Sequence, residues 1–136
     1  MKTPVKFQDV AVITEVTSTA SQIFIDVFDY KNSRRGSYNV SHSRHSKQRS
    51  CQRGISDLLI AMAIHYGKLT KKQGLEYYTL GDRSIPPILA REKVRNLVVI
   101  LSGDTNQIVT CYRSNDASRR IARKRKYLRE TKELAE

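Results

Sequence analysis

Residues 97–101, with the sequence Leu-Val-Val-Ile-Leu, constrain the fold of this chain more than any other segment. A strand whose side chains are all apolar must be covered on both faces, so it belongs in the interior of a sheet. Residues 75–80 and 107–113 are rich in β-branched and aromatic residues, and the glycine-containing segment 102–106 predicts a hairpin loop. The sequence therefore predicts an antiparallel sheet of about four strands with residues 97–101 at its centre.

Two helices are predicted ahead of this sheet. The first spans about residues 41–52, with Ser41 as its N-cap and Gly54 closing it in the left-handed conformation that glycine adopts at little cost. The second follows Ser56, another N-cap, and carries apolar residues at helical spacing until Gly67 ends it. Because the apolar face of this second helix needs a partner, we expect it to cover the sheet.

The first 40 residues are predicted to form a β-hairpin. Residues 9–16 and 22–30 are rich in β-branched and aromatic residues, and residues 17–21 between them are typical of a turn. The polar residues 32–37 indicate a connector. An isolated hairpin is marginally stable in water, so we expect this one to pack on the rest of the chain or on a partner.

Two further helices are predicted after the second one. Two prolines, which a first helical turn tolerates, indicate a helix over residues 84–95. Residues 116–136 are strongly basic with few large apolar side chains, and we expect their helix to form fully only on a partner. The chain is thus predicted to be α+β, with an N-terminal extension (1–40), a core of two helices packed on the antiparallel sheet (41–115) and a basic C-terminal helix (116–136).

The charge of the chain indicates a polyanionic partner. Twenty-five Lys and Arg residues against thirteen Asp and Glu residues give a formal net charge of +12, and most of the excess lies after residue 40. Nucleic acid and an anionic membrane surface both fit this charge. No run approaches the roughly 20 apolar residues of a membrane span, and the first residues do not resemble a signal peptide. We therefore expect a cytoplasmic protein without a membrane partner.

The cysteines indicate neither a disulfide framework nor a zinc site. Cys51 and Cys111 are too few for the former and lack the CxxC spacing of the latter. A zinc site made of His42, His45, Cys51 and Cys111 is disfavoured, because Cys51 would project from the opposite side of the predicted helix. We expect no metal and no cofactor.

Histidines and arginines are predicted to share one face of the first helix. At about 100° per residue, His42, His45, Arg49 and Arg53 fall within a sector of about 80°. Imidazole titrates near neutral pH, and guanidinium groups match the geometry of phosphate, so this pairing suits RNA chemistry. The alternatives are ordinary surface roles: a solvated His45, an ion-paired Arg49, and an Arg53 that caps the carbonyls at the end of the helix.

Several short motifs follow one another along the chain: His45-x-x-x-Arg49-x-x-x-Arg53-Gly54-Ile55-Ser56, Tyr66-Gly67, Gln73-Gly74-x-Glu76-x-Tyr78-x-Leu80-Gly81, Val98-Val99-Ile100-Leu101-Ser102-Gly103-Asp104 and Ile108-Val109-Thr110-Cys111-Tyr112-Arg113. In this order they resemble the bacterial domain-of-unknown-function 4258 family over roughly residues 41–127. That family looks related to the barnase, EndoU, colicin and RelE superfamily, in which many members are metal-independent ribonuclease toxins. The resemblance implies two helices packed on an antiparallel sheet and suggests that activity.

RNA cleavage without a metal requires a base, a cation for the phosphorane charge and an acid. His45 could supply the base or the acid, and we favour Arg49 over Arg53 as the cation. Thr110 and Tyr112 should share one face of the last strand together with Ile108, where the hydroxyls could orient a phosphate or move a proton. The alternative is that Thr110 and Tyr112 are ordinary strand residues.

The sequence therefore predicts a metal-independent endoribonuclease of toxin type that acts on tRNA or mRNA, with His45, Arg49, Thr110 and Tyr112 as its catalytic residues. Two alternatives remain open: a nucleic-acid-binding module without catalysis, and an interaction protein that docks an acidic partner such as an antitoxin or immunity protein. The predicted RNA contacts are His42, Arg53, Tyr78, Arg113, Arg119, Arg120, Arg123, Lys124 and Lys126.

Overall fold

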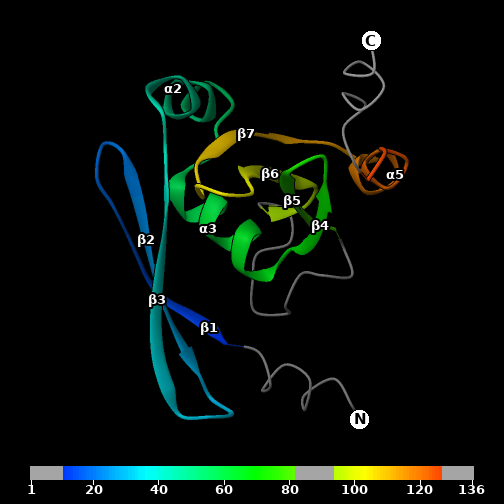
Figure 1. Cartoon of the computed structure of the whole chain (residues 1–136). Coiled ribbons are helices and arrows are strands. Elements are labelled where there is room, and N and C mark those ends of the chain that lie inside the picture. The colour runs from blue at the N-terminus through cyan, green and yellow to red at the C-terminus, as the bar shows by residue number, and fades with distance from the viewer. Residues whose placement is uncertain (1–10, 82–93, 127–136) are drawn as a thin grey trace.

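The computed structural model describes residues 11–81 and 94–126, and within them the chain is an α+β protein with two antiparallel sheets (Figure 1). No helix in these two ranges is long and apolar enough to cross a membrane. The elements, in chain order, are β1 (Val12–Ser18), β2 (Gln22–Asp29), β3 (Arg34–Ser41), α2 (Arg44–Gln52), α3 (Asp57–Tyr66), β4 (Lys68–Lys72), β5 (Leu75–Leu80), β6 (Leu97–Ser102), β7 (Ile108–Arg113) and α5 (Ala117–Ala122).

The larger sheet has the strand order β4-β5-β6-β7, with every neighbouring pair antiparallel. Strand β6 lies inside it, and residues 97–101 are all buried, as their apolar sequence predicts. Strand β4 was not predicted. Its sequence, Lys-Leu-Thr-Lys-Lys, lacks an apolar alternation, and it becomes a strand by pairing with the apolar β5.

Helix α3 covers one face of this sheet and confirms the predicted second helix. The Ser56 side chain accepts a hydrogen bond from the Leu59 backbone N–H, which caps the first turn. The helix ends at Gly67, where other backbone atoms lie too close to leave room for a side chain. A Cβ at this position would collide with the Ala63 carbonyl oxygen and would lie 3.0 Å from the carbonyl oxygen of Thr79.

Helix α2 begins later than predicted. Ser43, rather than Ser41, is its N-cap, and it forms a reciprocal capping box with Ser46. The predicted cap was wrong because Ser41 is the last residue of β3, where its N–H donates to the Asn106 carbonyl. Gly54 does follow the helix in the predicted left-handed conformation, with φ of 69°.

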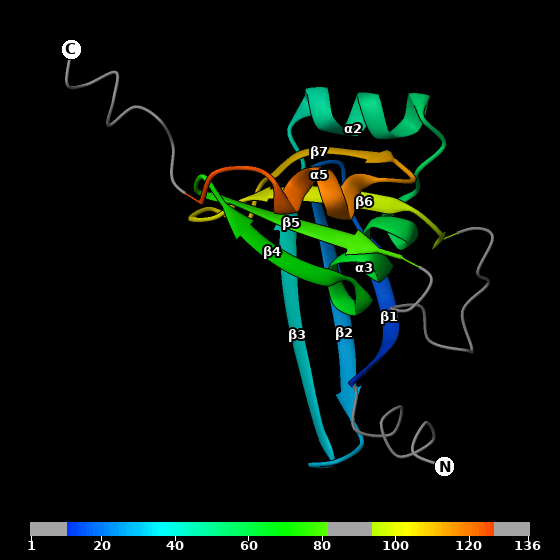
Figure 2. The ribbon, with the colours of Figure 1, turned by 90° about the vertical axis from the view of Figure 1, so that its right-hand side faces the viewer.

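Helix α5 packs on the opposite face of the sheet from α3 (Figure 2). Its buried residues Ala117 and Ile121 contact Tyr77, Val98 and Ile100 in a second, smaller hydrophobic cluster. The helix ends at Ala122, far short of the predicted 116–136 segment. The last ten residues of that segment lie outside the described residues, as does the predicted helix at 84–95 apart from its last two residues.

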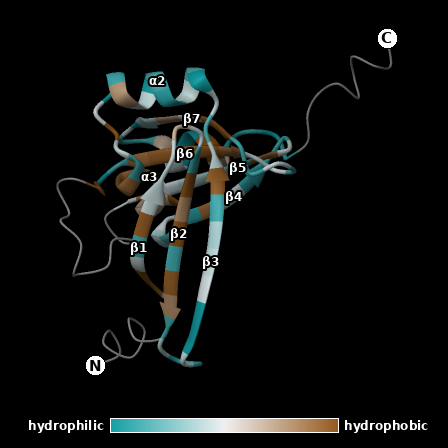
Figure 3. Cartoon of the chain, turned by 90° about the vertical axis from the view of Figure 1, so that its left-hand side faces the viewer, coloured by the Kyte–Doolittle hydropathy of each residue, from teal (hydrophilic) through white to brown (hydrophobic). Residues whose placement is uncertain are grey.

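The N-terminal residues form three strands rather than the predicted two. Their order is β1-β2-β3, and the β2–β3 end projects away from the helices as an arm (Figures 1 and 2). The predicted connector at 32–37 was wrong, because most of it belongs to β3. In Figure 3 most of β3 is teal or near white rather than brown, so it lacks an apolar signature of its own and forms a strand by pairing with β2.

The main hydrophobic cluster joins the two sheets through α3. It includes Ile23 and Val40 from the N-terminal sheet, Ile60 from α3, and Val99 and Leu101 from β6. Burial of a large aliphatic side chain stabilises a fold by about 1.5–3 kcal/mol. The N-terminal sheet is therefore held by the same core that holds α3 on the larger sheet.

Candidate functional site

Helix α2 lies along the outer edge of β7 (Figure 2). Near the start of the helix, Ser41 forms a parallel bridge with Gln107, which precedes β7. At the end of the helix, the Arg53 Nη1 donates to the Thr110 Oγ1 at 3.2 Å and to the Cys111 carbonyl at 2.6 Å. The helix thus covers an edge strand whose backbone would otherwise be open.

The side chain of Arg53 joins α2 to β7. Its backbone N–H donates to the Arg49 carbonyl, but its guanidinium group reaches across to the strand instead of capping the helix. Arg53, and not Arg49, thus makes the contact with Thr110, while the preference for Arg49 as the cation that meets the phosphorane charge stays a prediction.

His45 and Arg49 are exposed on the flank of α2 that also leads to Arg53. At about 100° per residue, the three positions fall within about 80° of one another. The other flank carries Lys47, whose Nζ donates to the Asp57 Oδ2 on α3 at 2.7 Å. The two flanks therefore serve different roles: one holds the helix to α3, and the other faces solvent beside Thr110.

His42 does not belong to this exposed flank. It precedes the N-cap, and only 1% of its side-chain surface is exposed. Its Nδ1 lies 2.7 Å from the Ser46 Oγ, and its Nε2 lies 3.3 Å from the Asp57 Oδ1. Burial lowers the pKa of His42, although the Asp57 carboxylate opposes this effect. The predicted RNA contact at His42 was wrong, because the imidazole is enclosed between α2 and α3.

Asp57 connects His42 with Lys47. Burial works to raise the pKa of Asp57, but the hydrogen bond from Lys47 and the nearby charges of Lys47 and His42 outweigh it, so the pKa lies below its usual value. The carboxylate therefore stays ionised and anchors the start of α3 to α2.

Thr110 and Tyr112 share one face of β7, as predicted, but Ile108 does not lie with them. Thr110 pairs with Ile100, Tyr112 pairs with Val98, and a bulge shifts the register before Ile108 pairs with Leu101. Ile108 is buried in the main cluster, whereas Tyr112 packs against the second cluster beneath α5. The bulge thus turns Ile108 away and leaves the two hydroxyl side chains on the α5 side of the sheet.

Tyr78 packs into the core, and Arg113 contacts Arg95. Tyr78 packs against the main cluster, and its hydroxyl donates to the Glu76 Oε1 at 3.2 Å. Burial, followed by the charge of Glu76, raises the pKa of Tyr78 to about 12. Arg113 is exposed, and its Nη1 donates to the Arg95 carbonyl at 3.4 Å. The ring of Tyr78 is therefore part of the core rather than an open platform for a base.

The basic residues predicted near the C-terminus are exposed on α5 and on the segment that follows it: Arg119, Arg120, Arg123, Lys124 and Lys126. Sequence reasoning missed two further cations on this side of the molecule, Lys68 and Lys71 of β4. The run Lys68–Lys72 directly after Gly67 was their signal, but a lysine-rich segment outside a predicted strand could not be placed.

The described residues hold no group of three or more His, Cys, Asp and Glu side chains that could bind a metal ion. Cys51 is exposed on α2 and Cys111 is buried in β7, where burial raises the pKa of its thiol. Both ring nitrogens of His42 already have hydrogen-bond partners, Ser46 and Asp57. The zinc site that the sequence analysis disfavoured is therefore not assembled from these residues.

Fold and site together define an α+β protein with a basic helix along the edge of its four-stranded sheet. No family model matches the chain, and neither a curated protein nor a solved structure matches it significantly.

Proposed function

We propose that this protein is a metal-independent endoribonuclease whose site is the exposed flank of α2 beside β7. One observation supports the proposal above the others: the hydrogen bond from Arg53 to Thr110 at 3.2 Å. This contact links the helix that carries His45 and Arg49 to the strand that carries Thr110 and Tyr112. Residues separated by more than 50 positions in the sequence thereby lie on adjoining elements.

The proposed reaction is attack by the RNA 2′-hydroxyl oxygen on the adjacent phosphorus. His45 accepts the proton of the 2′-hydroxyl, while the guanidinium groups of Arg49 and Arg53 stabilise the charge that develops on the phosphorane oxygens. The bond from phosphorus to the 5′-oxygen then breaks, and that oxygen takes up the proton that His45 has accepted. The products are a 2′,3′-cyclic phosphate and a 5′-hydroxyl end.

The exposure of this flank fits a polymeric substrate. His45 and Arg49 are exposed to solvent on the outside of α2. A long RNA such as tRNA or mRNA can reach such a surface. We include in the proposal the toxin-like role that the family resemblance implies, with an acidic antitoxin or immunity protein as inhibitor.

The test is incubation of the purified protein with total RNA or tRNA in excess EDTA. We expect fragments with 2′,3′-cyclic phosphate ends, no fragments with the His45→Ala variant, and a rate lower by about 100-fold with Arg49→Ala. Arg44→Ala is the matched control, because Arg44 is exposed on the other flank of the same helix. Absence of cleavage of any RNA by the wild-type protein would refute the enzymatic proposal.

The second candidate function is nucleic-acid binding without catalysis. It is favoured by the exposed cations on α5 and on the segment that follows it, which need no reacting group to bind phosphates. Under this alternative, His45→Ala leaves RNA affinity nearly unchanged and no variant cuts RNA. If the protein instead docks an acidic protein partner, it should form a stable complex with that partner and have no affinity for RNA.

A further inference from the structure

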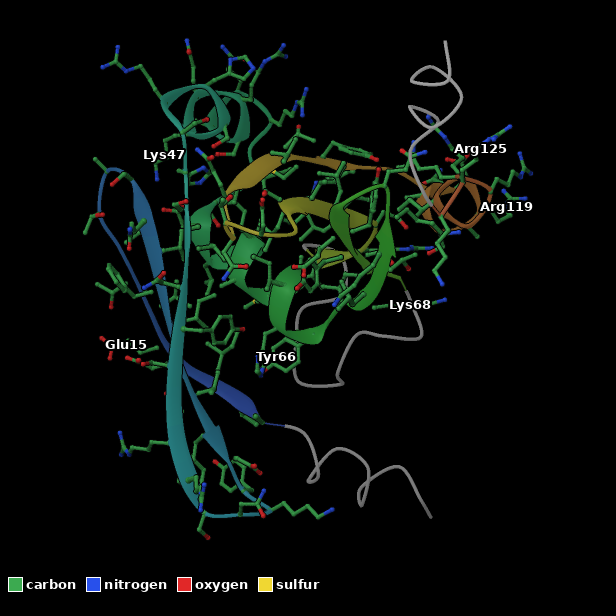
Figure 4. The ribbon with its side chains drawn as sticks, in the orientation of Figure 1. Glu15, Lys47, Tyr66, Lys68, Arg119 and Arg125 are labelled. Carbon is green, nitrogen blue, oxygen red and sulfur yellow. The ribbon has the colours of Figure 1, made fainter. Side chains whose placement is uncertain are left out.

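Helix α5 presents its basic residues outward. Ala117 and Ile121 are buried against the sheet, so the intervening positions Arg119 and Arg120 face solvent, as does Arg123 after the helix. Figure 4 shows the side chains of Arg119 and Arg125 on the outer side of this element, with Lys68 of β4 below them. The cations on this side of the molecule thus come from two separate parts of the chain.

The segment after α5 is held against β4. The Lys72 Nζ donates to the carbonyls of Ala122 at 3.3 Å and Lys124 at 3.1 Å, and the Gln73 N–H donates to the Lys126 carbonyl at 2.9 Å. The Lys124 ammonium lies 5.9 Å from the centre of the Tyr77 ring. These contacts place the basic residues 123–126 beside β4, instead of letting them continue as a helix.

The resulting α5–β4 surface consists of eight cations: Lys68, Lys71, Arg119, Arg120, Arg123, Lys124, Arg125 and Lys126. Among the residues that the structure describes, the carboxylates near this surface are few, and each has a hydrogen-bond or ion-pair partner. Asp116 lies 3.7 Å from Arg120. Glu76 and Asp104 help line an adjoining open cavity of about 470 Å³, where each already accepts a hydrogen bond, from Tyr78 and Ser102 respectively. The surface therefore carries a large positive excess.

The chemistry of this surface favours a phosphate backbone over a protein partner. The centre of a protein interface is built from apolar and aromatic side chains and is depleted of lysine. Here the apolar residues Ile121 and Tyr77 are buried beneath the cations, and within the described part of the chain Leu69 of β4 is the large apolar side chain exposed nearby. Phosphate contacts, by contrast, require exposed Lys and Arg side chains and no apolar centre.

We infer that the α5–β4 surface binds the phosphate backbone of RNA independently of its sequence, as a site separate from the α2 flank. Figure 1 places α5 on the far side of β7 from α2. This inference rests on the proposed function for the identity of the polyanion as RNA. The α5–β4 surface supplies affinity, whereas the α2 flank supplies the reacting groups.

The test measures binding of wild-type protein to 2′-O-methyl RNA oligonucleotides of several sequences, which lack the attacking hydroxyl and stay intact. We expect the Arg119→Glu/Arg123→Glu variant to bind all of them about tenfold or more weakly. The slope of log affinity against log salt should become shallower by about 1.4, since each lost contact with single-stranded RNA removes about 0.7. Arg119→Gln/Arg123→Gln, which removes charge without reversing it, should change both quantities in the same direction.

The matched control is Arg34→Glu/Arg35→Glu, which makes the same charge change on the exposed arm near the β2–β3 turn. It should change affinity and salt slope much less. Equal effects of the two double variants would overturn the inference, because they would show a response to net charge alone. Unchanged RNA affinity in Arg119→Glu/Arg123→Glu with loss of an acidic protein partner would also overturn it.

Kinetic measurements with cleavable RNA distinguish a failure of this inference from a failure of the proposed function. We expect Arg119→Glu/Arg123→Glu to raise KM by about the factor lost in affinity, with kcat unchanged at saturating RNA. If the variant binds RNA more weakly but no form of the protein cuts RNA, the ribonuclease proposal is refuted and the inferred binding surface is supported. If the variant cuts RNA with the KM of the wild type, the ribonuclease proposal is supported and the role of the α5–β4 surface in RNA binding is refuted.

Discussion

Two histidines three residues apart, His42 and His45, have different surroundings in the fold. Because Ser43 caps α2, His42 falls before the helix and is enclosed by Ser46 and Asp57, while His45 lies in the first turn and is exposed. The two-residue difference between the predicted cap, Ser41, and the observed cap, Ser43, therefore changes which imidazole can meet a substrate. His42 contributes to stability, and we assign the proposed chemistry to His45.

At the residue scale, His42 should make stability depend on pH. Burial lowers the pKa of His42 in the folded chain, so the unfolded chain binds more protons near and below its pKa of about 6.5. The free energy of unfolding should therefore be largest above about pH 6.5 and decrease as the pH falls below it. Urea unfolding at a series of pH values between 7.5 and 5.5 measures this decrease.

The matched variants for this measurement are His42→Gln and His45→Ala. His42→Gln should be less stable at pH 7.5 by about 1–3 kcal/mol, because Ser46 and Asp57 lose a buried partner, and its stability should vary less with pH. His45→Ala should keep the pH dependence of the wild type. A His42→Gln variant that loses as much stability on acidification as the wild type would show that another group titrates.

At the scale of elements, the joint between α3 and β4 depends on Gly67. A methyl group there would meet the carbonyl oxygens of Ala63 and Thr79, neither of which can move without disturbing α3 or β5. We expect Gly67→Ala to lower the free energy of unfolding by about 1–3 kcal/mol, as measured by urea denaturation. Gly81→Ala is the control, since a Cβ at Gly81 meets no atom within 4 Å. Equal stability of the two variants would contradict the close approach.

The contact between α2 and β7 gives a second prediction at this scale. Arg53→Ala removes the hydrogen bonds to Thr110 and to the Cys111 carbonyl, at a cost to stability of about 0.5–1.5 kcal/mol. Its RNA cleavage rate should fall by about 100-fold, because the guanidinium would also be missing from the phosphate. Thermal unfolding and kcat should be measured together. If the Arg53→Ala variant keeps full kcat, Arg53 is not part of the proposed site.

The elements that the sequence predicts are those with an apolar signature of their own. The inner strand β6, the strand β5 and the helix α3 carry apolar residues at strand or helix spacing, and all three form close to their predicted bounds. Strands β3 and β4 are polar, and they form because β2 and β5 offer them backbone partners. Such pairing depends on which segments meet in space, so it leaves no local pattern to find.

The features of the candidate site also fall into those that local sequence predicts and those that depend on packing. Helical spacing alone places His45 and Arg49 on one flank of α2, since spacing is a local property. The link from Arg53 to Thr110 spans 57 residues and depends on how α2 packs against β7. The enclosure of His42 similarly depends on Asp57 of α3, which spacing along α2 does not reveal.

At the scale of the whole molecule, the net charge of +12 should make RNA cleavage depend strongly on salt. Cations on the α2 flank and on the α5–β4 surface would both release counterions when RNA binds. Raising the salt from about 50 to about 200 mM should lower kcat/KM steeply, while kcat at saturating RNA changes little. A steady-state series over this range measures both. A kcat/KM that does not respond to salt would contradict binding through phosphates.

The ribonuclease proposal is tested most directly by digesting tRNA in excess EDTA with wild type, His45→Ala and the control Arg44→Ala side by side. We predict fragments with 2′,3′-cyclic phosphate ends for wild type and Arg44→Ala, and intact tRNA for a folded His45→Ala variant. Equal cleavage by His45→Ala and wild type, or no cleavage of any RNA by the wild type, would contradict the proposed site on α2.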